Sequence, residues 1–211
     1  MADTAPSPVP SAAPTEADAD AALLARYAAG AQDAARLLAG RHAGRLLAHA
    51  TRMLGGDVAE AEDAVQEAFL RLWRAAPGWR ADGGARVGTW LFKVTGNLCI
   101  DRLRRRRTPV ASLSDEGVAE PASQAPGAAA ALMQAQRADA LQRALNRLPE
   151  RQRQAVVLRH LDGLSNPEIA AVMDTGVEAV ESLLARARRA LAADLVPKRD
   201  ELGYADDRTD G

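Results

Sequence analysis

The sequence predicts an all-α protein in which a flexible linker joins two small helical domains, the second of them a helix-turn-helix domain. Ala, Leu, Arg and Glu dominate its 211 residues and favour helix, whereas β-branched residues are sparse. Apolar residues repeat at helical spacing on both sides of residues 108–127, a stretch rich in Pro, Ser and acidic residues. The length of this stretch favours two domains over one.

The composition divides the chain into five segments. Residues 1–20 have three Pro among the first ten positions, and we expect a disordered tail there. The segments predicted to follow are a first helical domain, the linker, a second helical domain and a loose polar tail: residues 21–107, 108–127, 128–194 and 195–211.

Three helices are expected before the first Pro-Gly break. Apolar spacing begins at about Ala21 and predicts a short helix that ends at Gly30, followed by a longer helix over 32–54. Asp57 is the predicted N-cap of the third helix, which has acidic residues in its early turns and basic residues in its last turn. That order of charges suits the helix dipole.

A loop over residues 79–88, rich in Gly and Arg, separates the third helix from the fourth. Thr89 is the predicted N-cap of the fourth helix, whose apolar residues repeat at spacings of three and four. This helix ends in an Arg run over 104–107, and Pro109 closes it.

Helical patterning returns over about residues 128–161, where Pro149 separates two helices. Ser165 and Glu168 match a capping box at the start of a further helix.

A break over residues 174–176 separates that helix from a last one over about 177–193. Two helices joined by such a turn, the second one rich in Arg, are typical of a helix-turn-helix that binds DNA. A plain helical hairpin within a bundle is the alternative interpretation.

Aromatic rings and positive charge concentrate between residues 69 and 107. Five of the seven Phe, Trp and Tyr residues lie there. Residues 71–107 have ten basic and two acidic side chains, a local excess of eight positive charges in a chain of formal net charge −1. Flipping a base costs roughly a few kcal/mol, and stacking it on a ring returns about 1–3 kcal/mol. Trp79 lies in a loop and Trp90 opens a helix, positions that allow exposure, and both are therefore candidates for trapping an unstacked base beside bound phosphates.

Several kinds of site are not expected. The single Cys99, expected to be buried, excludes an internal disulfide, and together with His42, His49 and His160 it is too little for a structural zinc site. There is no phosphate loop, metal-ligand spacing or nucleophile motif, so we expect no catalytic residue, metal or cofactor. No signal peptide or membrane-spanning run is recognisable, which predicts a cytoplasmic protein without membrane insertion.

Two blocks of the sequence resemble a known family. Residues 57–73 and 88–107 are similar to region 2 of extracytoplasmic-function (ECF) RNA polymerase sigma factors. Residues 145–165 and the helix-turn-helix that follows are similar to region 4. The two matches cover most of residues 21–193, in the right order and with a short linker between them.

The resemblance implies a non-catalytic subunit that binds core RNA polymerase and promoter DNA and is held by an anti-sigma factor. The third helix would dock on the largest polymerase subunit through Asp57, Glu60, Asp63, Gln66, Glu67, Arg71 and Arg74. The minus-ten strand would contact Trp79, Arg80, Trp90, Lys93, Asn97, Arg102, Arg104, Arg105, Arg106 and Arg107. The last helix would bind the minus-thirty-five element through Ser182, Arg186, Arg188 and Arg189.

The last helix departs from the family pattern at its beginning. Glu181 stands where the family commonly has Lys, Leu183 where it often has Arg, and Glu178 adds a further acid. An acid there repels phosphate, although Glu can also accept a hydrogen bond from the amino group of cytosine.

Two other functions compete with this interpretation. A stand-alone helix-turn-helix regulator would use the second domain alone and bind duplex DNA without polymerase, which leaves the aromatic and basic first domain unexplained. A small helical enzyme would need a catalytic motif, and none is recognisable.

Overall fold

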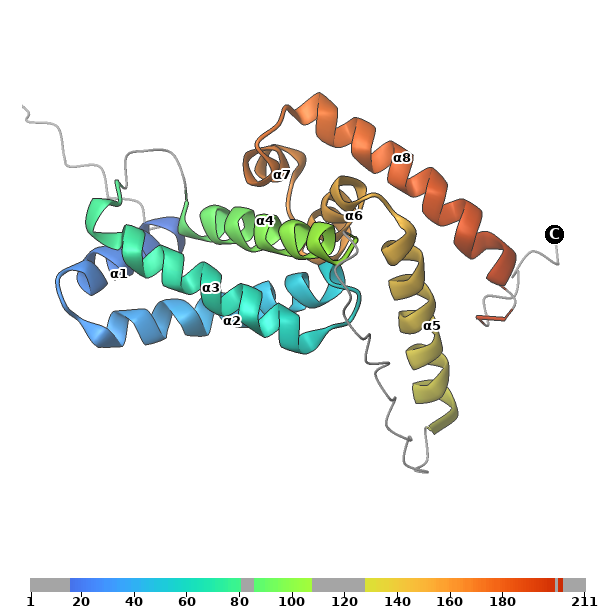
Figure 1. Ribbon diagram of the computed structural model, residues 1–211, viewed down its shortest axis with the longest axis horizontal. Helices are drawn as coiled ribbons and strands as arrows, with labels where there is room; N and C mark the ends of the chain where they lie inside the picture. The colour runs from blue at the N-terminus through green and yellow to red at the C-terminus, as the bar shows by residue number, and fades with distance from the viewer. Residues whose placement is uncertain (1–15, 81–85, 108–127, 200, 203–211) are drawn as a thin grey trace, which may run out of the picture.

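The computed structural model describes residues 16–80, 86–107, 128–199 and 201–202 (Figure 1). All regular elements within these ranges are helical, which confirms the predicted all-α class. The predicted linker lies outside the described residues, as does most of each predicted tail.

The first module comprises four helices. Their bounds are α1 Glu16–Ala28, α2 Gln32–Met53, α3 Val58–Ala75 and α4 Val87–Arg107, with a 3₁₀ turn at Ala76–Gly78. Gly55 and Gly56 have φ angles of 80° and 98°, a left-handed conformation that lets the chain reverse tightly between α2 and α3. The helical order expected for this half of the sequence is therefore observed.

Helix α1 begins earlier than expected, because a tertiary contact extends it. The prediction placed the disordered tail up to residue 20, whereas residues 16–20 are helical. Asp20 is buried, and its two carboxylate oxygens lie 2.8 Å from Nη1 of Arg41 and 2.7 Å from Nε2 of His42, both on α2. These partners lie some twenty positions away in the chain, so the local composition gives no sign of them.

Helix α4 also begins earlier than expected, and the prediction that Thr89 is its N-cap is wrong. The helix starts at Val87, so Thr89 lies within the first turn. The amide of Trp90 donates a hydrogen bond of 3.0 Å to the carbonyl of Arg86, and Val87 is buried in the core. Burial of an apolar residue before the predicted cap therefore fixes the start of the helix.

The second module contains the remaining helices. Their bounds are α5 Ala128–Arg147, α6 Glu150–Val156, α7 Asn166–Met173 and α8 Val177–Leu195. Helix α6 continues into a π-helical turn, η2, at Val157–Leu161, and α8 is followed by a 3₁₀ turn at Val196–Lys198. A π-helical turn changes the direction in which the following residues project.

The predicted helix-turn-helix is confirmed in α7 and α8. Ser165 and Glu168 form the expected capping box, in which the amide of Ser165 donates a 2.8 Å hydrogen bond to the carboxylate of Glu168. Asp174 ends α7 in a left-handed conformation with φ 53°, and Gly176 is the N-cap of α8. Asp is one of the few non-glycine residues that adopt this conformation readily.

The two modules pack against each other, and one buried core runs through both. Helix α4 lies in the middle of the molecule, with α2 and α3 on one side and α6 and α7 on the other (Figure 1). The fully buried side chains include Leu24, Leu38, Leu72 and Leu91 in the first module and Leu145, Leu158 and Ile169 in the second. We call the contact between the two modules the seam.

Two leucines of α3 give a matched test of the core. Leu72 is 0% exposed and Leu70 is 41% exposed. We expect Leu72→Ala to lower the free energy of unfolding by about 2–5 kcal/mol, because it removes buried methyl groups and leaves a cavity. Leu70→Ala, the same change in the same helix, should lower it by less than about 1 kcal/mol. Urea denaturation followed by circular dichroism measures both values, and equal losses would contradict the described orientation of α3.

Candidate nucleic-acid interface

Helix α3 presents most of the residues predicted to contact polymerase as one exposed row. Asp57 is its N-cap, as predicted, and accepts a 3.0 Å hydrogen bond from the amide of Glu60. This hydrogen bond, together with Arg106, lowers the pKa of Asp57 below its usual value. The rest of the predicted set lies exposed or half-exposed on α3: Glu60, Asp63, Gln66, Glu67, Arg71 and Arg74.

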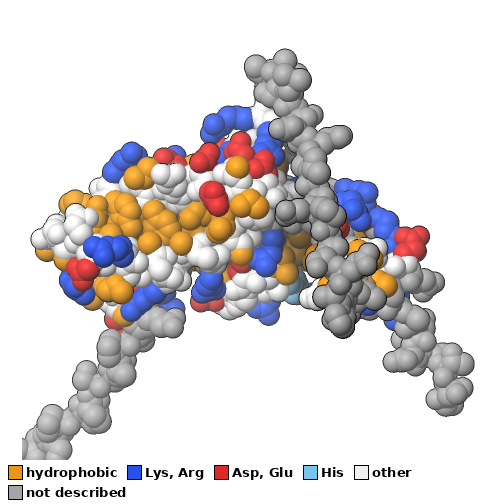
Figure 2. Space-filling view, turned by 90° about the horizontal axis from the view of Figure 1, so that it is seen from below, with side chains coloured by type: hydrophobic (Ala, Val, Ile, Leu, Met, Phe, Trp, Pro, Cys, Tyr) orange, Lys and Arg blue, Asp and Glu red, His pale blue; other side chains and the backbone are white. Residues whose placement is uncertain are grey.

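Hydrophobic side chains accompany this row. Val58 and Leu70 on α3 and Leu37 on α2 are among the most exposed large apolar residues of the described chain. Figure 2 shows hydrophobic side chains gathered along the elongated body of the first module, with charged groups around them. Exposed apolar surface with a polar rim is typical of a protein-binding face.

Two of the arginines predicted to contact DNA form ion pairs with the acidic start of α3. Arg102 Nε lies 2.9 Å from Oε2 of Glu60, and Arg106 Nη2 lies 2.6 Å from Oδ2 of Asp57. The structure therefore joins residues from two predicted sites, because the C-terminal end of α4 lies beside the N-terminal end of α3. Arg105 is exposed, whereas the side chain of Arg107 lies outside the described residues.

The tryptophans predicted to capture a base pack against each other. The rings of Trp79 and Trp90 meet edge to face, with centroids 5.9 Å apart and an interplanar angle of 83°. Both are half-buried, because they also cover part of the core, and each keeps some of its surface accessible. Arg80 is exposed beside them, and the loop residues 81–85 lie outside the described part of the chain.

Lys93, Asn97 and Arg104 lie on the side of α4 that faces the second module. Lys93 Nζ is 3.4 Å from Oδ1 of Asp174, in the turn of the helix-turn-helix. Asn97 and Arg104 line a polar cleft of about 340 Å³ whose opposite wall contains residues of the second module. The residues of that wall are Arg151, Gln154 and Met173.

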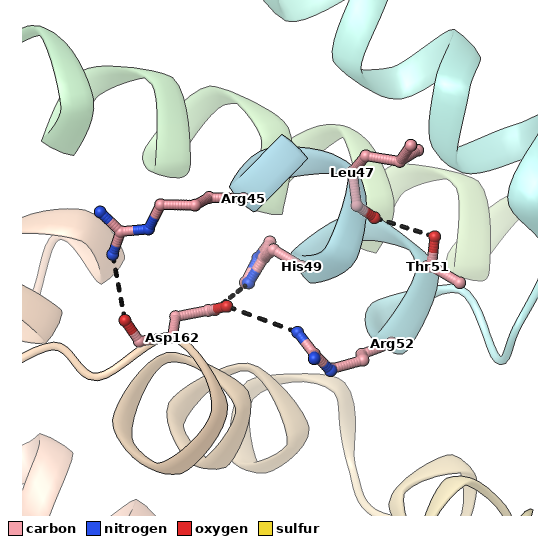
Figure 3. A network of polar contacts seen from close by, with 6 residues as sticks. All are labelled: Arg45, Leu47, His49, Thr51, Arg52 and Asp162. Atoms are coloured by element: carbon pink, nitrogen blue, oxygen red, sulfur yellow. Dashed lines mark hydrogen bonds and ion pairs between the residues drawn. The ribbon is translucent and has the colours of Figure 1, made fainter. Parts of the chain in front are cut away.

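Asp162 connects the modules through a network of polar contacts (Figure 3). Its carboxylate lies 2.7 Å from Nδ1 of His49 and 3.7 Å from Nη1 of Arg52, both on α2. Its main-chain carbonyl accepts a 3.1 Å hydrogen bond from Arg45. His49 is 0% exposed. The π-helical turn directly before Asp162 places Asp162 against α2. The network therefore joins three side chains of α2 to one residue of the second module.

Arg153 makes a second buried link across the seam. Its guanidinium donates a 2.6 Å hydrogen bond to the carbonyl of Met53, the last residue of α2. It donates another of 2.7 Å to the carbonyl of Asn146, near the end of α5. The final carbonyls of a helix have no partner within the helix and carry partial negative charge, so a cation is well placed there.

The predicted minus-thirty-five residues lie on α8. Arg186, Arg188 and Arg189 are exposed, and Ser182 is half-buried. Glu178 and Glu181 are exposed in the first turns of the same helix. The outer surface of α8 therefore begins acidic and becomes basic towards its C-terminal half.

Sequence reasoning missed the residues that form the seam, chiefly His49, Asp162 and Arg153. One signal was available in Gly96, since a glycine inside a helix lowers helix stability and often marks a close approach of another element. Within the described residues, no cluster of three or more His, Cys, Asp or Glu is arranged to hold a metal ion. No helix of this part of the chain is long and apolar enough to cross a bilayer.

Two family models match the chain. Residues 38–108 match Sigma-70 region 2, and residues 138–191 match Sigma-70, region 4. The first range covers α3, α4 and most of α2, and the second covers the helix-turn-helix with the helices before it. The combination defines a sigma-70 type of transcription initiation protein.

Similar proteins define the family more closely. The ECF RNA polymerase sigma factor SigM of Mycobacterium tuberculosis is 38% identical over 175 residues, which cover 82% of this chain and 83% of that protein. The ECF RNA polymerase sigma-E factor of Escherichia coli K12 is 34% identical over 183 residues, 82% of this chain and 92% of that protein. The solved structure of CnrH in complex with the cytosolic domain of CnrY is 32% identical, with a TM-score of 0.63, and the match covers 85% of this chain and 99% of that one. The chain belongs to the ECF family of RNA polymerase sigma factors.

The Asp162 network gives a prediction for stability. Asp162→Ala leaves the buried Nδ1 of His49 without its partner, and an unsatisfied buried polar group costs about 1–3 kcal/mol. We expect a corresponding loss in the free energy of unfolding of the full chain. Asp139→Ala is the matched control, because Asp139 is exposed on α5. Thermal denaturation of both variants measures the difference, and a loss no larger than that of the control would show that the network contributes little.

Proposed function

We propose that this sigma factor binds core RNA polymerase through the outer face of α3. The observation that carries this proposal is the exposed row on that helix, in which positions 63, 66, 67, 70, 71 and 74 recur at helical spacing. The row combines the exposed Leu70 with acidic residues at one end and basic residues at the other. An apolar centre with a charged rim fits a specific protein interface.

In promoter binding, we assign α4 and the residues that precede it to the minus-ten strand. Exposed cations such as Arg80 and Arg105 would neutralise phosphates. Trp79 and Trp90 would form the wall of a pocket for the base, because the two rings already contact each other edge to face and neither is fully exposed for stacking. A base that enters this pocket would stack on one accessible ring face.

The proposed minus-thirty-five reader is α8, the second helix of the helix-turn-helix. Arg186, Arg188 and Arg189 would contact phosphates, while Ser182 would face the base edges. Glu178 and Glu181 are exposed where such a helix enters the major groove. The amino group of cytosine is a base-edge donor for such a carboxylate, so these residues favour a cytosine in the element.

The same proposal covers location and partners. A subunit that works on RNA polymerase acts in the cytoplasm and leaves the chemistry to the polymerase. An anti-sigma factor is the proposed inhibitor. What supports this is the structure of the relative CnrH described above, in which a second protein, the cytosolic domain of CnrY, is bound.

Co-purification with core polymerase tests the proposal. The chain should bind core enzyme and direct run-off transcription from a promoter selected by the holoenzyme. The triple change Asp63→Ala, Gln66→Ala and Leu70→Ala should abolish binding, because it removes the centre of the α3 row. A matched control changes the same three residue types at exposed positions of α5: Leu132→Ala, Gln136→Ala and Asp139→Ala.

The outcome separates the proposal from the alternative. A stand-alone regulator would bind duplex DNA equally well with and without polymerase and would not co-purify with it. If the α3 variant binds core enzyme as well as the α5 control does, the docking face lies elsewhere.

The Arg run gives a quantitative prediction. Replacing Arg104–Arg107 with Ala should weaken promoter binding by the holoenzyme at all sequences, because phosphate contacts carry no sequence information. The slope of log K against log salt should fall by about 0.7 for each single-strand phosphate that is no longer neutralised. Arg36→Ala with Arg143→Ala, two exposed arginines outside the predicted DNA sets, should leave the slope unchanged. Titrations over a range of salt concentrations measure this, and an unaltered slope in the Arg-run variant would argue against phosphate contact.

A further inference from the structure

The N-terminal half of α5 has little of its surface covered within the described part of the chain. Residues 131–139 are exposed except for Met133 and Arg137, which are half-buried. Figure 1 shows this part of α5 projecting beyond the other helices. Helices shorter than about 12–15 residues are only marginally stable in water when nothing packs against them. We therefore expect a further segment to cover this half of α5.

A groove of about 830 Å³ lies between this half of α5 and the place where α8 ends. Its apolar lining includes Leu141 on α5 together with Leu195 and Val196. Val196 is 65% exposed although its side chain is apolar. Among the described residues that line the groove, the charged ones are two arginines, Arg137 and Arg199. The groove therefore suits a segment that combines an aromatic side chain with acidic groups.

We propose that residues 203–211 of the same chain occupy this groove. These residues lie outside the described part of the chain, but Leu202, which precedes them, is described. Leu202 lines the groove, and its main-chain carbonyl accepts a 2.8 Å hydrogen bond from Nε of Arg137. Residues 203–211 therefore begin at the wall of the groove, at a point that α5 holds in place. The proposal is independent of the roles assigned to α3 and α4.

The sequence of residues 203–211 complements the groove in charge and in apolar character. It has three acids against one arginine, so its formal charge is −2, whereas the two arginines of the groove carry two positive charges. Tyr204 comes two positions after Leu202 and can place its ring on the apolar lining while its hydroxyl stays in water. Asp206 and Asp207 follow and can form charge-assisted hydrogen bonds with the two arginines.

Length and attachment favour this occupant over a separate molecule. An extended chain covers about 3.3–3.6 Å per residue, so the stretch from Leu202 to Asp207 can span about 17 Å. The α5 side of the groove extends from Gln134 to Leu141, roughly 10 Å at about 1.5 Å per residue. A short tether also gives an effective concentration in the millimolar range. Contacts too weak to hold a separate molecule can therefore hold this segment.

Occupation of the groove has two consequences. It buries apolar surface beside the first turns of α5 and so stabilises the start of the second module. It also keeps an exposed apolar surface from other molecules, so a partner that binds this groove must first displace residues 203–211.

Chemical cross-linking of the full-length chain tests where residues 203–211 lie. A water-soluble carbodiimide activates a carboxylate, a lysine amine attacks it, an amide bond forms, and the reagent leaves as a urea. Gln134→Lys places an amine on the groove. Gln136→Lys is the matched control, because Gln136 is also exposed on α5 but lies on the opposite side of the helix. Lys198 with Asp194, 3.2 Å apart, is the internal reference and should react in both variants.

Mass spectrometry of peptides gives the outcome. We expect Gln134→Lys to form an amide with Asp206 or Asp207, and Gln136→Lys to form about tenfold less of it. Changing Asp206 and Asp207 to Asn should remove this product and spare the reference. Equal yields from the two variants would overturn the proposal, because the segment would then pass freely around α5. A product that joins two molecules and falls on dilution would also overturn it, since a second copy would then occupy the groove.

Amide hydrogen exchange tests the effect on α5 without an added lysine. The triple change Tyr204→Ser, Asp206→Asn and Asp207→Asn should speed exchange over residues 131–139 by about two- to tenfold, as follows when about half to nine tenths of the molecules have the segment docked.

The control for exchange removes two acidic charges at exposed positions elsewhere. Asp63→Asn with Asp101→Asn should leave exchange over residues 131–139 unchanged. Equal exchange rates in the triple variant and the wild type would overturn the proposal and leave the groove open to a segment of another protein.

Discussion

The guanidinium of Arg153 lies between the ends of two helices that belong to different modules. It is buried, always charged and bonded to the carbonyls of Met53 and Asn146. A buried charge is costly unless hydrogen bonds compensate for it, and the last carbonyls of a helix are equally in need of donors. The buried guanidinium therefore needs the carbonyls as hydrogen-bond acceptors, and the carbonyls need the guanidinium as a donor. Because the two helix ends can satisfy one arginine only when they are adjacent, this link determines how α2, α5 and α6 meet, and with them the position of the whole helix-turn-helix.

In that arrangement, three faces of α4 contact three different parts of the protein. Leu91 and Leu98 point into the core, Arg102 and Arg106 contact the acidic start of α3, and the stripe from Lys93 to Arg104 faces the second module. A helix that was expected to present its basic side chains to DNA thus has three of them, Lys93, Arg102 and Arg106, in ion pairs within the protein. Ion pairs at partly exposed positions contribute little stability, so phosphates can compete with the acidic partners of these side chains. The contacts of α4 therefore suit an exchange of partners better than permanent structure.

The surfaces that stay exposed have a different character. The outer row of α3 combines apolar and charged groups, and the outer face of α8 carries arginines. Neither takes part in the ion pairs across the seam, so both are exposed while the two modules pack together.

The sequence by itself determined the helices, because their signals are local. The N-cap of α3, the capping box of α7, the turn at residues 174–176 and the apolar repeats all depend on residues within a few positions of one another. The resemblance to two sigma regions identified the family in the same way, because each region is a continuous stretch of sequence. The early start of α1, the packing of Trp79 on Trp90, and the role of His49, Asp162 and Arg153 depended on partners from eleven to more than one hundred positions away. Only the tertiary structure decided these, because a buried charge or ring depends on whichever element packs against it, and no short segment of the chain encodes that neighbour.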